Sequence, residues 1–402
     1  MTTTPAAIPP QSSTPTNASP STLGILGGGQ LARMLVHAAQ RMGYGTVVLD
    51  PTPASPAGQA SHSQIEAAYS DPNGWQRLLD ASDAITTEFE NVPAAALQFL
   101  AQSKPVSPPA SAVAAAQDRL LEKQHFTQCG VRCAPYHAIS TLQDVQSAPP
   151  ALFPAILKTA RLGYDGKGQA QVATLPALEQ AWRDMGSVPC VLEQRLPLAL
   201  ECSVIVARNA QGQIVHFAPQ RNVHHDGILS TTYAFAGAVP PALADDLVQA
   251  TARIAQGLQY VGVLCVEYFV LQDGGWVVNE MAPRPHNSGH YTIDACEHSQ
   301  FDLQVRTTMQ LPLPQPRQHS AAIMLNILGD IWFDASGQTR TPPWQAVQHL
   351  SGVHLHLYGK QGVQRKRKMG HITITAASAQ AAQQRAAEVA QALGLPFEPL
   401  PV

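Results

Sequence analysis

The sequence predicts a mixed α/β and α+β protein that begins on a parallel sheet, and two observations carry this prediction. An apolar run at 23–26 ends in three glycines, apolar residues at helical spacing follow over 30–43, and a second apolar run covers 46–49. Strand, turn, helix and strand in this order form a βαβ unit, which pairs its two strands in parallel. Strand-like segments then dominate from about 155 to 233, which indicates a second part that is richer in strands.

The remaining elements follow from the same patterns. Residues 1–21 carry no charge and are rich in Thr, Pro and Ser, which predicts a disordered tail. The Pro-, Ser- and Ala-rich stretch 104–116 is expected to be a linker, and Gly130 is expected to end a helix over 118–129. Further strands are expected at 84–87, 155–158, 190–193, 202–207 and 214–218, and near Ile323 and His354. Further helices are expected at 242–258 and 378–393.

The composition is that of an ordinary globular protein and argues against several classes of function. Hydrophobic residues make up 45% of the 402 residues, and the net charge of −3 provides no general attraction for nucleic acid or an anionic membrane. No apolar run approaches the roughly 20 residues of a membrane helix. The six cysteines form no CxxC pair and are expected to be thiols of a reducing compartment, so we expect a cytoplasmic protein.

A glycine turn follows the first strand. Residues 27–32 fit the pattern GxGxxG/A, and Asp50 ends the next strand, as in the dinucleotide-binding fingerprint. Glycines also let backbone amides and a helix N-terminus approach any anion. Three interpretations therefore stay open, namely NAD, another anionic ligand and a structural tight turn.

A second glycine-rich segment lies directly after Lys158, which ends a strand. Its loop contains Gly163, Gly166 and Gly168. The amides of such a loop can fold over phosphate groups while lysines supply point charges. The GK[ST] ending of a Walker A motif is absent, and a flexible surface hairpin is the alternative.

A hairpin signal lies at 273–274, where Asp-Gly separates strand-like runs at 263–271 and 276–280. With these two residues as the turn, Glu267 pairs with Glu280. Two carboxylates directly opposite each other, with Cβ atoms roughly 5 Å apart, repel. A hard divalent cation such as Mg²⁺ relieves that repulsion, with a shared proton or another register as the alternatives.

Polar and basic residues near this hairpin indicate a second ligand. Asn279 adds an oxygen beside Glu280, and the polar, proline-stiffened loop 281–290 is where a second substrate would lie. The basic run 365–371 is either a solvated face or a phosphate anchor.

These segments resemble the ATP-grasp family and, within it, the N5-carboxyaminoimidazole ribonucleotide synthases of de novo purine biosynthesis. The resemblance extends over nearly the whole chain beyond residue 22, and the stretch NEMAPRPHNSGHYTIDAC is its longest specific part. Ala32 departs from it by replacing a more usual glycine. The other segments that carry the resemblance are 27–31, 88–92, 117–119, 163–169, 225–228 and 367–371.

The resemblance implies a three-domain ATP-grasp fold and a homodimer. A Rossmann-like domain would cover 22–117, an ATP-grasp domain 118–312 with a smaller lid at about 118–200, and a C-terminal domain 313–402. It also implies an ADP-forming ligase that uses ATP, Mg²⁺ and bicarbonate to carboxylate 5-aminoimidazole ribonucleotide, with no nucleic-acid or membrane partner.

The resemblance also implies roles for individual residues. Glu267 and Glu280 would bind magnesium, and Tyr164, Asp165, Lys167 and Arg284 would act in catalysis. ATP would contact Arg119, Lys158, Gly163, Tyr164, Asp165, Gly166, Lys167, Gly168, Gln169, Glu193, Gln194, Arg195, Leu196, Glu201, His224, Asn279 and Glu280. The ribonucleotide would contact Gln30, Leu31, Glu88, Arg284, His286, Asn287, Lys360, Arg367 and Lys368.

Three other functions remain as alternatives at this stage. Another ATP-grasp ligase, such as a formate-dependent glycinamide ribonucleotide transformylase, would keep Glu267 and Glu280 but need other substrate residues. An NAD-dependent oxidoreductase would use the glycine turn but leave the paired glutamates unexplained. A non-catalytic nucleotide-binding regulator would not need the full set of polar residues.

Overall fold

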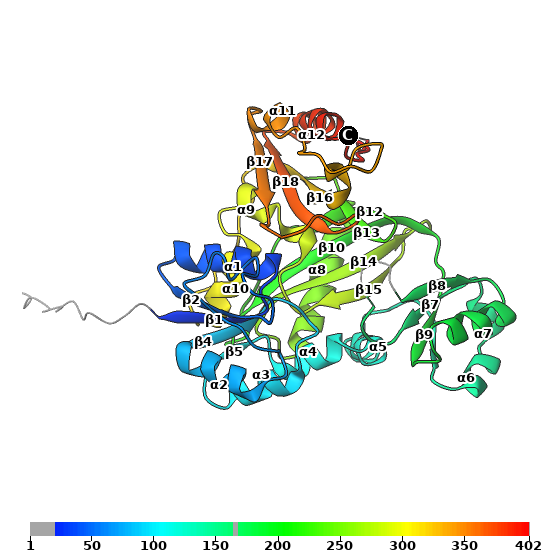
Figure 1. Ribbon diagram of the computed structural model, residues 1–402. Helices are drawn as coiled ribbons and strands as arrows, with labels where there is room; N and C mark the ends of the chain where they lie inside the picture. Colours follow the sequence, from blue (N-terminus) through cyan, green and yellow to red (C-terminus); the bar gives the residue numbers. More distant parts are fainter. Residues whose placement is uncertain (1–20, 164–167, 402) are drawn as a thin grey trace, which may run out of the picture.

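The computed structural model of the chain describes residues 21–163 and 168–401. These residues form three sheets (Figure 1). The expected tail, apart from residue 21, and four residues of the glycine-rich loop lie outside the described residues.

The first sheet confirms the expected parallel βαβ unit. Its strands lie in the order β3-β2-β1-β4-β5, and all of its pairs are parallel. One face packs on α1 and the other on α2 and α3 (Figure 1). The elements are β1 (Thr22–Leu26), α1 (Gln30–Arg41), β2 (Gly45–Leu49), β3 (Ser63–Ile65), α2 (Pro72–Ala81), β4 (Ala84–Thr87), α3 (Ala94–Ala101), β5 (Val106–Ser107) and α4 (Ala110–Ala116).

The prediction of a linker over 104–116 is wrong. This stretch contributes the edge strand β5 and the helix α4. Alanine is the best helix former, and Pro109 immediately before α4 does not interfere with it, so a composition typical of linkers also suits a short helix here.

The second sheet is antiparallel and has nine strands. Its order is β15-β14-β10-β12-β13-β16-β18-β17, with β11 paired to β10. The strands after residue 320 extend this same sheet, because β16 pairs with β13. Its strands are β10 (Leu198–Arg208), β11 (Ile214–His216), β12 (Gln220–His225), β13 (Ile228–Ala234), β14 (Gly262–Leu271), β15 (Trp276–Ala282), β16 (Ala321–Leu328), β17 (Val353–Leu357) and β18 (Lys368–Ala376). The accompanying helices are α8 (Pro241–Gly257), η2 (Asn287–Gly289), α9 (Thr292–Ala295), α10 (Gln300–Thr308), η3 (Gly329–Trp332), α11 (Gln345–Gln348) and α12 (Ala379–Leu393).

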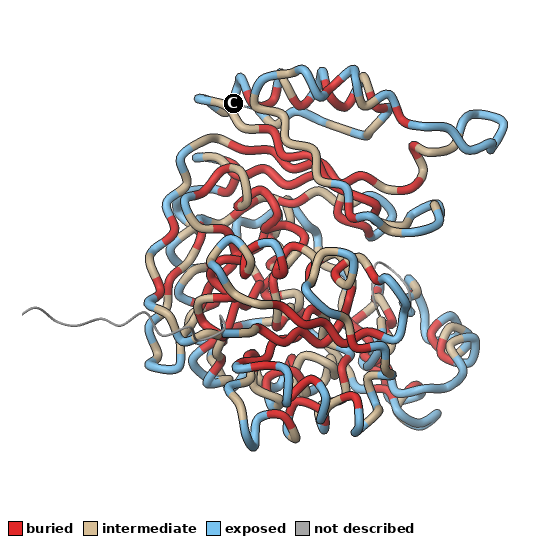
Figure 2. The backbone as a smooth tube through the Cα atoms, turned by 60° about the vertical axis from the view of Figure 1, so that its left-hand side comes forward, coloured by how far each residue is buried: buried red, intermediate tan, exposed pale blue. Residues whose placement is uncertain are grey.

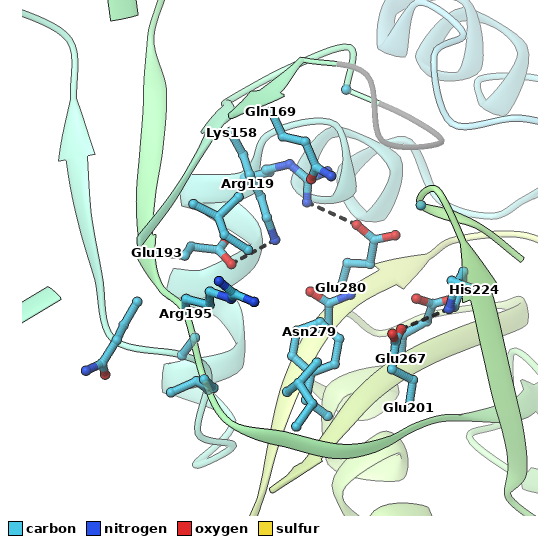
Figure 3. A pocket seen from close by; sticks show the side chains of 18 of the residues that line it. Arg119, Lys158, Gln169, Glu193, Arg195, Glu201, His224, Glu267, Asn279 and Glu280 are labelled. Carbon is cyan, nitrogen blue, oxygen red and sulfur yellow. Dashed lines mark hydrogen bonds and ion pairs between the residues drawn. The ribbon is translucent and has the colours of Figure 1, made fainter. Parts of the chain in front are cut away.

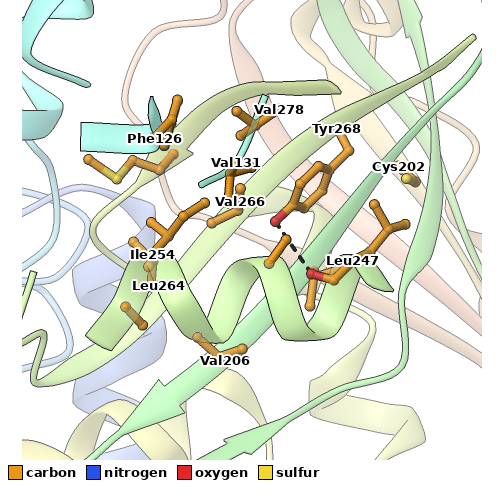
Figure 4. Close-up of a cluster of buried hydrophobic side chains, with 14 of the residues drawn as sticks. Phe126, Val131, Cys202, Val206, Leu247, Ile254, Leu264, Val266, Tyr268 and Val278 are labelled. Atoms are coloured by element: carbon orange, nitrogen blue, oxygen red, sulfur yellow. Dashed lines mark hydrogen bonds between the residues drawn. The ribbon is translucent and has the colours of Figure 1, made fainter. Parts of the chain in front are cut away.

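The main core lies between this sheet and α8 (Figure 4). Leu247 and Ile254 of α8 are fully buried against strand residues such as Val206 and Leu264. The Tyr268 hydroxyl lies 2.7 Å from Thr251 Oγ1, so its polar end is satisfied inside the core. Buried segments run through the large sheet and the adjoining parallel sheet (Figure 2), which gives the strands that carry the site a rigid base.

The third sheet is small and stands apart from the other two (Figure 1). Its order is β6-β9-β7-β8, all antiparallel, and we call it the lid sheet. Helix α5 connects it to the rest of the chain and begins at the N-cap Asp118. The elements are α5 (Arg119–Gln128), β6 (Tyr136–Ile139), α6 (Leu142–Gln146), η1 (Pro150–Leu152), β7 (Ala155–Thr159), β8 (Gln169–Val172), α7 (Leu175–Asp184) and β9 (Cys190–Gln194).

Candidate active site

A cleft of about 820 Å³ lies between the lid sheet and the large sheet. Figure 3 shows its two walls, with Lys158 and Glu193 on the lid side and Glu267 and Glu280 on the other. The fold thus brings together residues that the sequence places far apart. The predicted residues that line the cleft are Arg119, Lys158, Gly163, Gln169, Glu193, Gln194, Arg195, Leu196, Glu201, His224, Glu267, Asn279 and Glu280.

The lid wall carries a buried cluster of charges. Glu193 on β9 lies diagonally across from Lys158 on β7, and Lys158 Nζ donates to Glu193 Oε2 at 2.8 Å. Lys123 on α5 reaches the other oxygen of Glu193 at 3.0 Å. Burial alone opposes ionisation of Glu193, but the ammonium groups of Lys158 and Lys123 lower its pKa to about 2. Glu193 is therefore a fixed anion between two lysines.

The opposite wall is the β14–β15 hairpin, and its turn differs from the predicted one. Leu271 N donates to Gly275 O at 2.8 Å, so three residues connect the strands, and Gly274 adopts a φ of +85°. Three-residue hairpins of this kind place a glycine in the left-handed region. The predicted two-residue turn is wrong, because Asp-Gly also suits the last two positions of the longer loop.

A β-bulge restores the register at the functional residues. Tyr268 pairs with Val278 and Val266 with Met281, so Asn279 and Glu280 both lie opposite Glu267. A bulge re-aims side chains in this way. It explains why Glu267, Asn279 and Glu280 all line the cleft (Figure 3).

The two glutamates have different surroundings. Burial, and then the neighbouring carboxylate of Glu280, raise the pKa of Glu267 to about 7. Burial also opposes ionisation of Glu280, but Arg119, whose Nη1 donates to Glu280 Oε2 at 3.0 Å, and then Lys158 hold the pKa of Glu280 below its usual value. The hairpin therefore presents one firm anion beside one carboxylate, Glu267, that contacts no lysine or arginine among the described residues.

The donor set fits a magnesium ion. Asn279 Oδ1 is buried and accepts no hydrogen bond within the described residues. Mg²⁺ binds one or two carboxylates and takes its other oxygens from phosphate and water. Among the residues that the structure describes, no group of three or more His, Cys, Asp or Glu side chains is arranged to hold a metal, so a metal here would depend on such external oxygens.

Glu201 and His224 form a pair at the end of the cleft. His224 Nδ1 lies 2.9 Å from Glu201 Oε2. Burial lowers the pKa of His224, but the adjacent carboxylate of Glu201 and the charge of Glu267 outweigh burial and raise it. His225, on the other face of β12, is exposed, as expected for adjacent strand residues.

A second cavity of about 420 Å³ adjoins the first and shares Arg119, Glu280 and His286 with it. Arg284 lines it and is held by Glu90, with Nε to Oε2 at 2.5 Å and Nη2 to Oε1 at 3.2 Å. Six of the residues predicted to bind the ribonucleotide line this cavity along with Arg284, namely Gln30, Leu31, Glu88, His286, Asn287 and Lys368.

The glycine turn binds the protein's own carboxylates. Gly29 N donates to Glu88 Oε1 at 2.6 Å, and Ala32 N donates to Glu88 Oε2 at 3.0 Å. Gly28 N donates to Asp50 Oδ2 at 2.7 Å. A Cβ on Gly29 would lie 2.4 Å from Glu88 Oε1, so this glycine is needed for the close approach. The turn therefore presents none of these three amides to a dinucleotide phosphate.

Other predicted residues are only partly located. Gly168 adopts a φ of +71° and its carbonyl accepts from Thr159 N, but Gly168 does not line either cavity. Arg367 donates to the carbonyls of Gln361 and Gly362, and Lys360 Nζ donates to Lys368 O at 2.8 Å. Neither Arg367 nor Lys360 lines either of these two cavities. Tyr164, Asp165, Gly166 and Lys167 lie outside the described residues.

Comparison with known proteins assigns each part of the chain. Three family models match, a ribonucleotide synthetase preATP-grasp domain at 21–117, an ATP-grasp domain at 124–301 and a phosphoribosylaminoimidazole carboxylase C-terminal domain at 322–385. The N5-carboxyaminoimidazole ribonucleotide synthase of Brucella melitensis is 42% identical over 356 residues, which are 88% of this chain and 96% of that protein. The chain belongs to the N5-carboxyaminoimidazole ribonucleotide synthase family.

Solved structures agree with this assignment. An N5-carboxyaminoimidazole ribonucleotide synthetase crystallised with ADP has a TM-score of 0.85 and 36% identity, over 92% of this chain and 97% of that chain. The Aspergillus clavatus enzyme in complex with ADP and 5-aminoimidazole ribonucleotide has a TM-score of 0.84 and 28% identity, over 94% and 99%. As a member of this synthase family, the protein is an ATP-grasp, ADP-forming ligase of purine biosynthesis.

Sequence reasoning missed three charged residues at the synthase site. Glu90 holds Arg284, Lys123 holds Glu193, and Glu122 Oε1 accepts from Met281 N at 2.7 Å. The last two share one face of α5 with Arg119, at the i, i+3 and i+4 spacing of a helix. That spacing was visible in the sequence, but it did not reveal which partners the face would meet.

Proposed function

We propose that this chain carboxylates 5-aminoimidazole ribonucleotide at its amino group, using ATP and bicarbonate and requiring Mg²⁺. The observation that carries the proposal is the opposition of Glu267 and Glu280 to Lys158 across a cleft that opens into a second cavity lined by Arg284. A cleft with these walls suits Mg-ATP, and the adjoining cavity suits a second anionic substrate. Related enzymes crystallised with ADP, and with ADP and 5-aminoimidazole ribonucleotide, support this choice of two ligands.

The cleft residues have distinct roles in this proposal. Lys158 and Arg119 bind phosphate oxygens, and the segment 193–196 meets the adenine with Glu201 at the ribose. Glu267, Glu280 and Asn279 would hold Mg²⁺, which when bound would neutralise charge on the ATP phosphates. Gly163 and Gln169 line the cleft at the ends of the glycine-rich loop, which would cover the phosphates. Tyr164, Asp165 and Lys167 stay predicted loop residues near bicarbonate and the amine.

The chemistry would proceed in two steps. A bicarbonate oxygen attacks the γ-phosphorus of ATP, the bond to the β-phosphate oxygen breaks, and ADP leaves from carboxyphosphate. In the direct route the ribonucleotide amine then attacks the carboxyl carbon of carboxyphosphate and phosphate leaves. In the alternative route carboxyphosphate first separates into phosphate and CO₂, and the amine attacks CO₂. The amine loses a proton in both routes. Lys158 stabilises charge on the transferring group, and closure over the intermediate would limit its hydrolysis.

Several features beyond the reaction are also proposed. Homodimerisation rests on the family resemblance, and light scattering of the purified chain would test it. A reducing, cytoplasmic setting is supported by all six cysteines being free thiols. None of the helices in 21–163 or 168–401 has the length and apolar character needed to cross a bilayer.

The test is ADP release with Mg-ATP. We expect strong stimulation only when bicarbonate and 5-aminoimidazole ribonucleotide are both present, and no stimulation by formate with glycinamide ribonucleotide. If the protein binds Mg-ATP but its rate of ADP release does not depend on bicarbonate, the proposed reaction is rejected and the proposed ATP site is kept.

A further inference from the structure

Lys123 on α5 is a buried cation that the proposed chemistry does not use. Its side chain is 1% exposed, and it lines neither cavity. Its Nζ lies 3.0 Å from Glu193 Oε1 and 5.5 Å from the centre of the Tyr136 ring. Because burying an ammonium group is costly even when it is paired, its position calls for an explanation in terms of function.

Glu193 is shared between Lys123 and Lys158. Each lysine contacts a different oxygen, with Lys158 Nζ 2.8 Å from Oε2. The three side chains therefore carry a net charge of +1, counted as two ammonium groups and one carboxylate. Only Lys158 of the two lysines lines the nucleotide cleft. Without Lys123, the carboxylate would pair with Lys158 alone and the cluster would be neutral.

Helix α5, which carries Lys123, contacts both walls of the cleft. Arg119 N donates to Ala160 O at 3.0 Å at the start of the glycine-rich loop, and Glu122 Oε1 accepts from Met281 N at 2.7 Å on β15. Lys123 lies next to Glu122 on the same helix. The helix that carries Lys123 is thus anchored to both walls, whereas Lys158 belongs to the lid sheet.

We infer that Lys123 is a positioning residue that neutralises Glu193 and so leaves Lys158 available to a nucleotide phosphate. Lys123 does not touch the nucleotide, and it acts by preventing Glu193 from competing with phosphate for Lys158. This inference rests on the ATP site proposed above. It makes the charge of the cluster, and not the identity of residue 123, the quantity that controls nucleotide affinity.

Two variants separate these possibilities. Lys123→Met keeps a similar length, lowers the cluster charge from +1 to 0 and leaves Lys158 paired to Glu193. Lys123→Met/Glu193→Gln returns the cluster charge to +1, carried by Lys158, and leaves no unpaired buried charge. Lys104→Met is the matched control, because Lys104 is half-buried in the first domain and lines neither cavity.

The experiment is calorimetric binding of the Mg²⁺ complex of the non-hydrolysable ATP analogue AMPPNP to the full chain, with a thermal melt of each variant. We expect Lys123→Met to bind about tenfold more weakly or worse, the size expected for a charge-assisted phosphate contact. We expect the double variant to bind more tightly than Lys123→Met and within about threefold of Glu193→Gln alone, which is its reference because Glu193 itself lines the cleft. In turnover, Lys123→Met is expected to raise KM for ATP with little change in kcat.

Wild-type affinity in Lys123→Met, or a double variant no tighter than the single one, would overturn the inference. A wild-type protein that does not bind Mg-AMPPNP would instead reject the proposed ATP site. If Lys123→Met does not fold, the double variant is compared with Glu193→Gln, so that the change at Glu193 is common to both proteins. Affinities within about threefold of each other support the inference, and a larger loss in the double variant means that Lys123 acts on the nucleotide in another way.

Discussion

Glu193 and Glu267 are buried glutamates on opposite walls of one cleft, and they behave in opposite ways. Two lysines lower the pKa of Glu193 to about 2 against the effect of burial, whereas burial and Glu280 raise the pKa of Glu267 to about 7. Burial is therefore common to both, and the neighbours decide the sign of the shift. On the lid wall one carboxylate lies between two lysines, whereas on the hairpin wall two carboxylates lie side by side, with Arg119 paired to Glu280.

This difference matches what Mg-ATP would bring to the cleft. The lid wall has cations for phosphate oxygens, and the hairpin wall has carboxylates for the metal that accompanies them. On the hairpin wall the two carboxylates repel each other directly, whereas on the lid wall Glu193 lies between the two lysines. Changes on the two walls should then affect stability and activity in different combinations.

The largest effect is expected from Glu267→Gln on the hairpin wall. Loss of one of two metal carboxylates should lower kcat/KM by about a hundredfold or more. The same change removes like-charge repulsion, so the Tm of the metal-free protein should rise. Kinetics at several Mg²⁺ concentrations and a melt in EDTA measure both. Glu297→Gln, which removes an exposed carboxylate paired to Arg317, is the control. A fall in both activity and Tm would mean that Glu267 is mainly structural.

The sequence predicted this hairpin wall for a reason that was partly incorrect. A two-residue turn would pair Glu267 with Glu280 directly, whereas the structure has a three-residue turn followed by a bulge that compensates for it. The apolar and polar pattern specifies which residues face the cleft, but it does not specify where an extra residue is accommodated. The functional residues were therefore predictable, and the backbone path was not.

Other residues of the site could not be predicted, because their partners are distant in the sequence. The role of Lys158 could be predicted, because Lys158 lies between a strand and a glycine-rich loop. The roles of the other two residues depend on long-range pairs, which are Lys123 with Glu193 and Glu90 with Arg284. Such partners lie 70 or more positions apart in the sequence (123 to 193, and 90 to 284), and no local pattern encodes them. The prediction for the segment 104–116 was wrong for a related reason, because its composition fits both a linker and the packed elements β5 and α4.

The pH dependence of stability should also differ between the walls. The pKa of Glu267 lies above its ordinary value of 4.5, so its contribution to stability is complete below pH 4.5 and is lost as pH rises through 7. Glu193 has a lowered pKa, so its contribution is present above pH 4.5 and is lost as pH falls towards 2. Between pH 5 and 8 in EDTA, the free energy of unfolding should fall by at most about 3 kcal/mol through Glu267.

Urea unfolding of wild type and Glu267→Gln at both pH values isolates this contribution. The variant should lose most of the difference between pH 5 and pH 8, and saturating Mg²⁺ should reduce it in wild type. If the free energy of unfolding changes equally with pH in the two proteins, groups other than Glu267 produce the pH dependence.

On the lid wall, Lys158→Met should raise KM for ATP by about 10- to 100-fold, because a charged contact to phosphate is lost. Its effect on Tm should be small, since Glu193 keeps Lys123 as a partner. Steady-state ADP release and a thermal melt measure the two quantities, with Lys104→Met as the control. An unchanged KM would place the phosphates elsewhere in the cleft.

The smallest effect is expected beyond both walls, at Glu90 in the second cavity. Glu90 orients Arg284 through two hydrogen bonds, and burial of Glu90 is offset by Arg284, which lowers the pKa of Glu90. Glu90→Gln keeps one acceptor but loses the two-point ionic contact, so Arg284 should be less well oriented. We expect KM for 5-aminoimidazole ribonucleotide to rise about five- to tenfold while KM for ATP stays unchanged. Asp83→Asn, at a residue that does not line the cavity, is the control. An equal rise in both KM values would mean that Glu90 supports the whole cleft, because the division into a nucleotide cavity and a substrate cavity requires the two constants to respond separately.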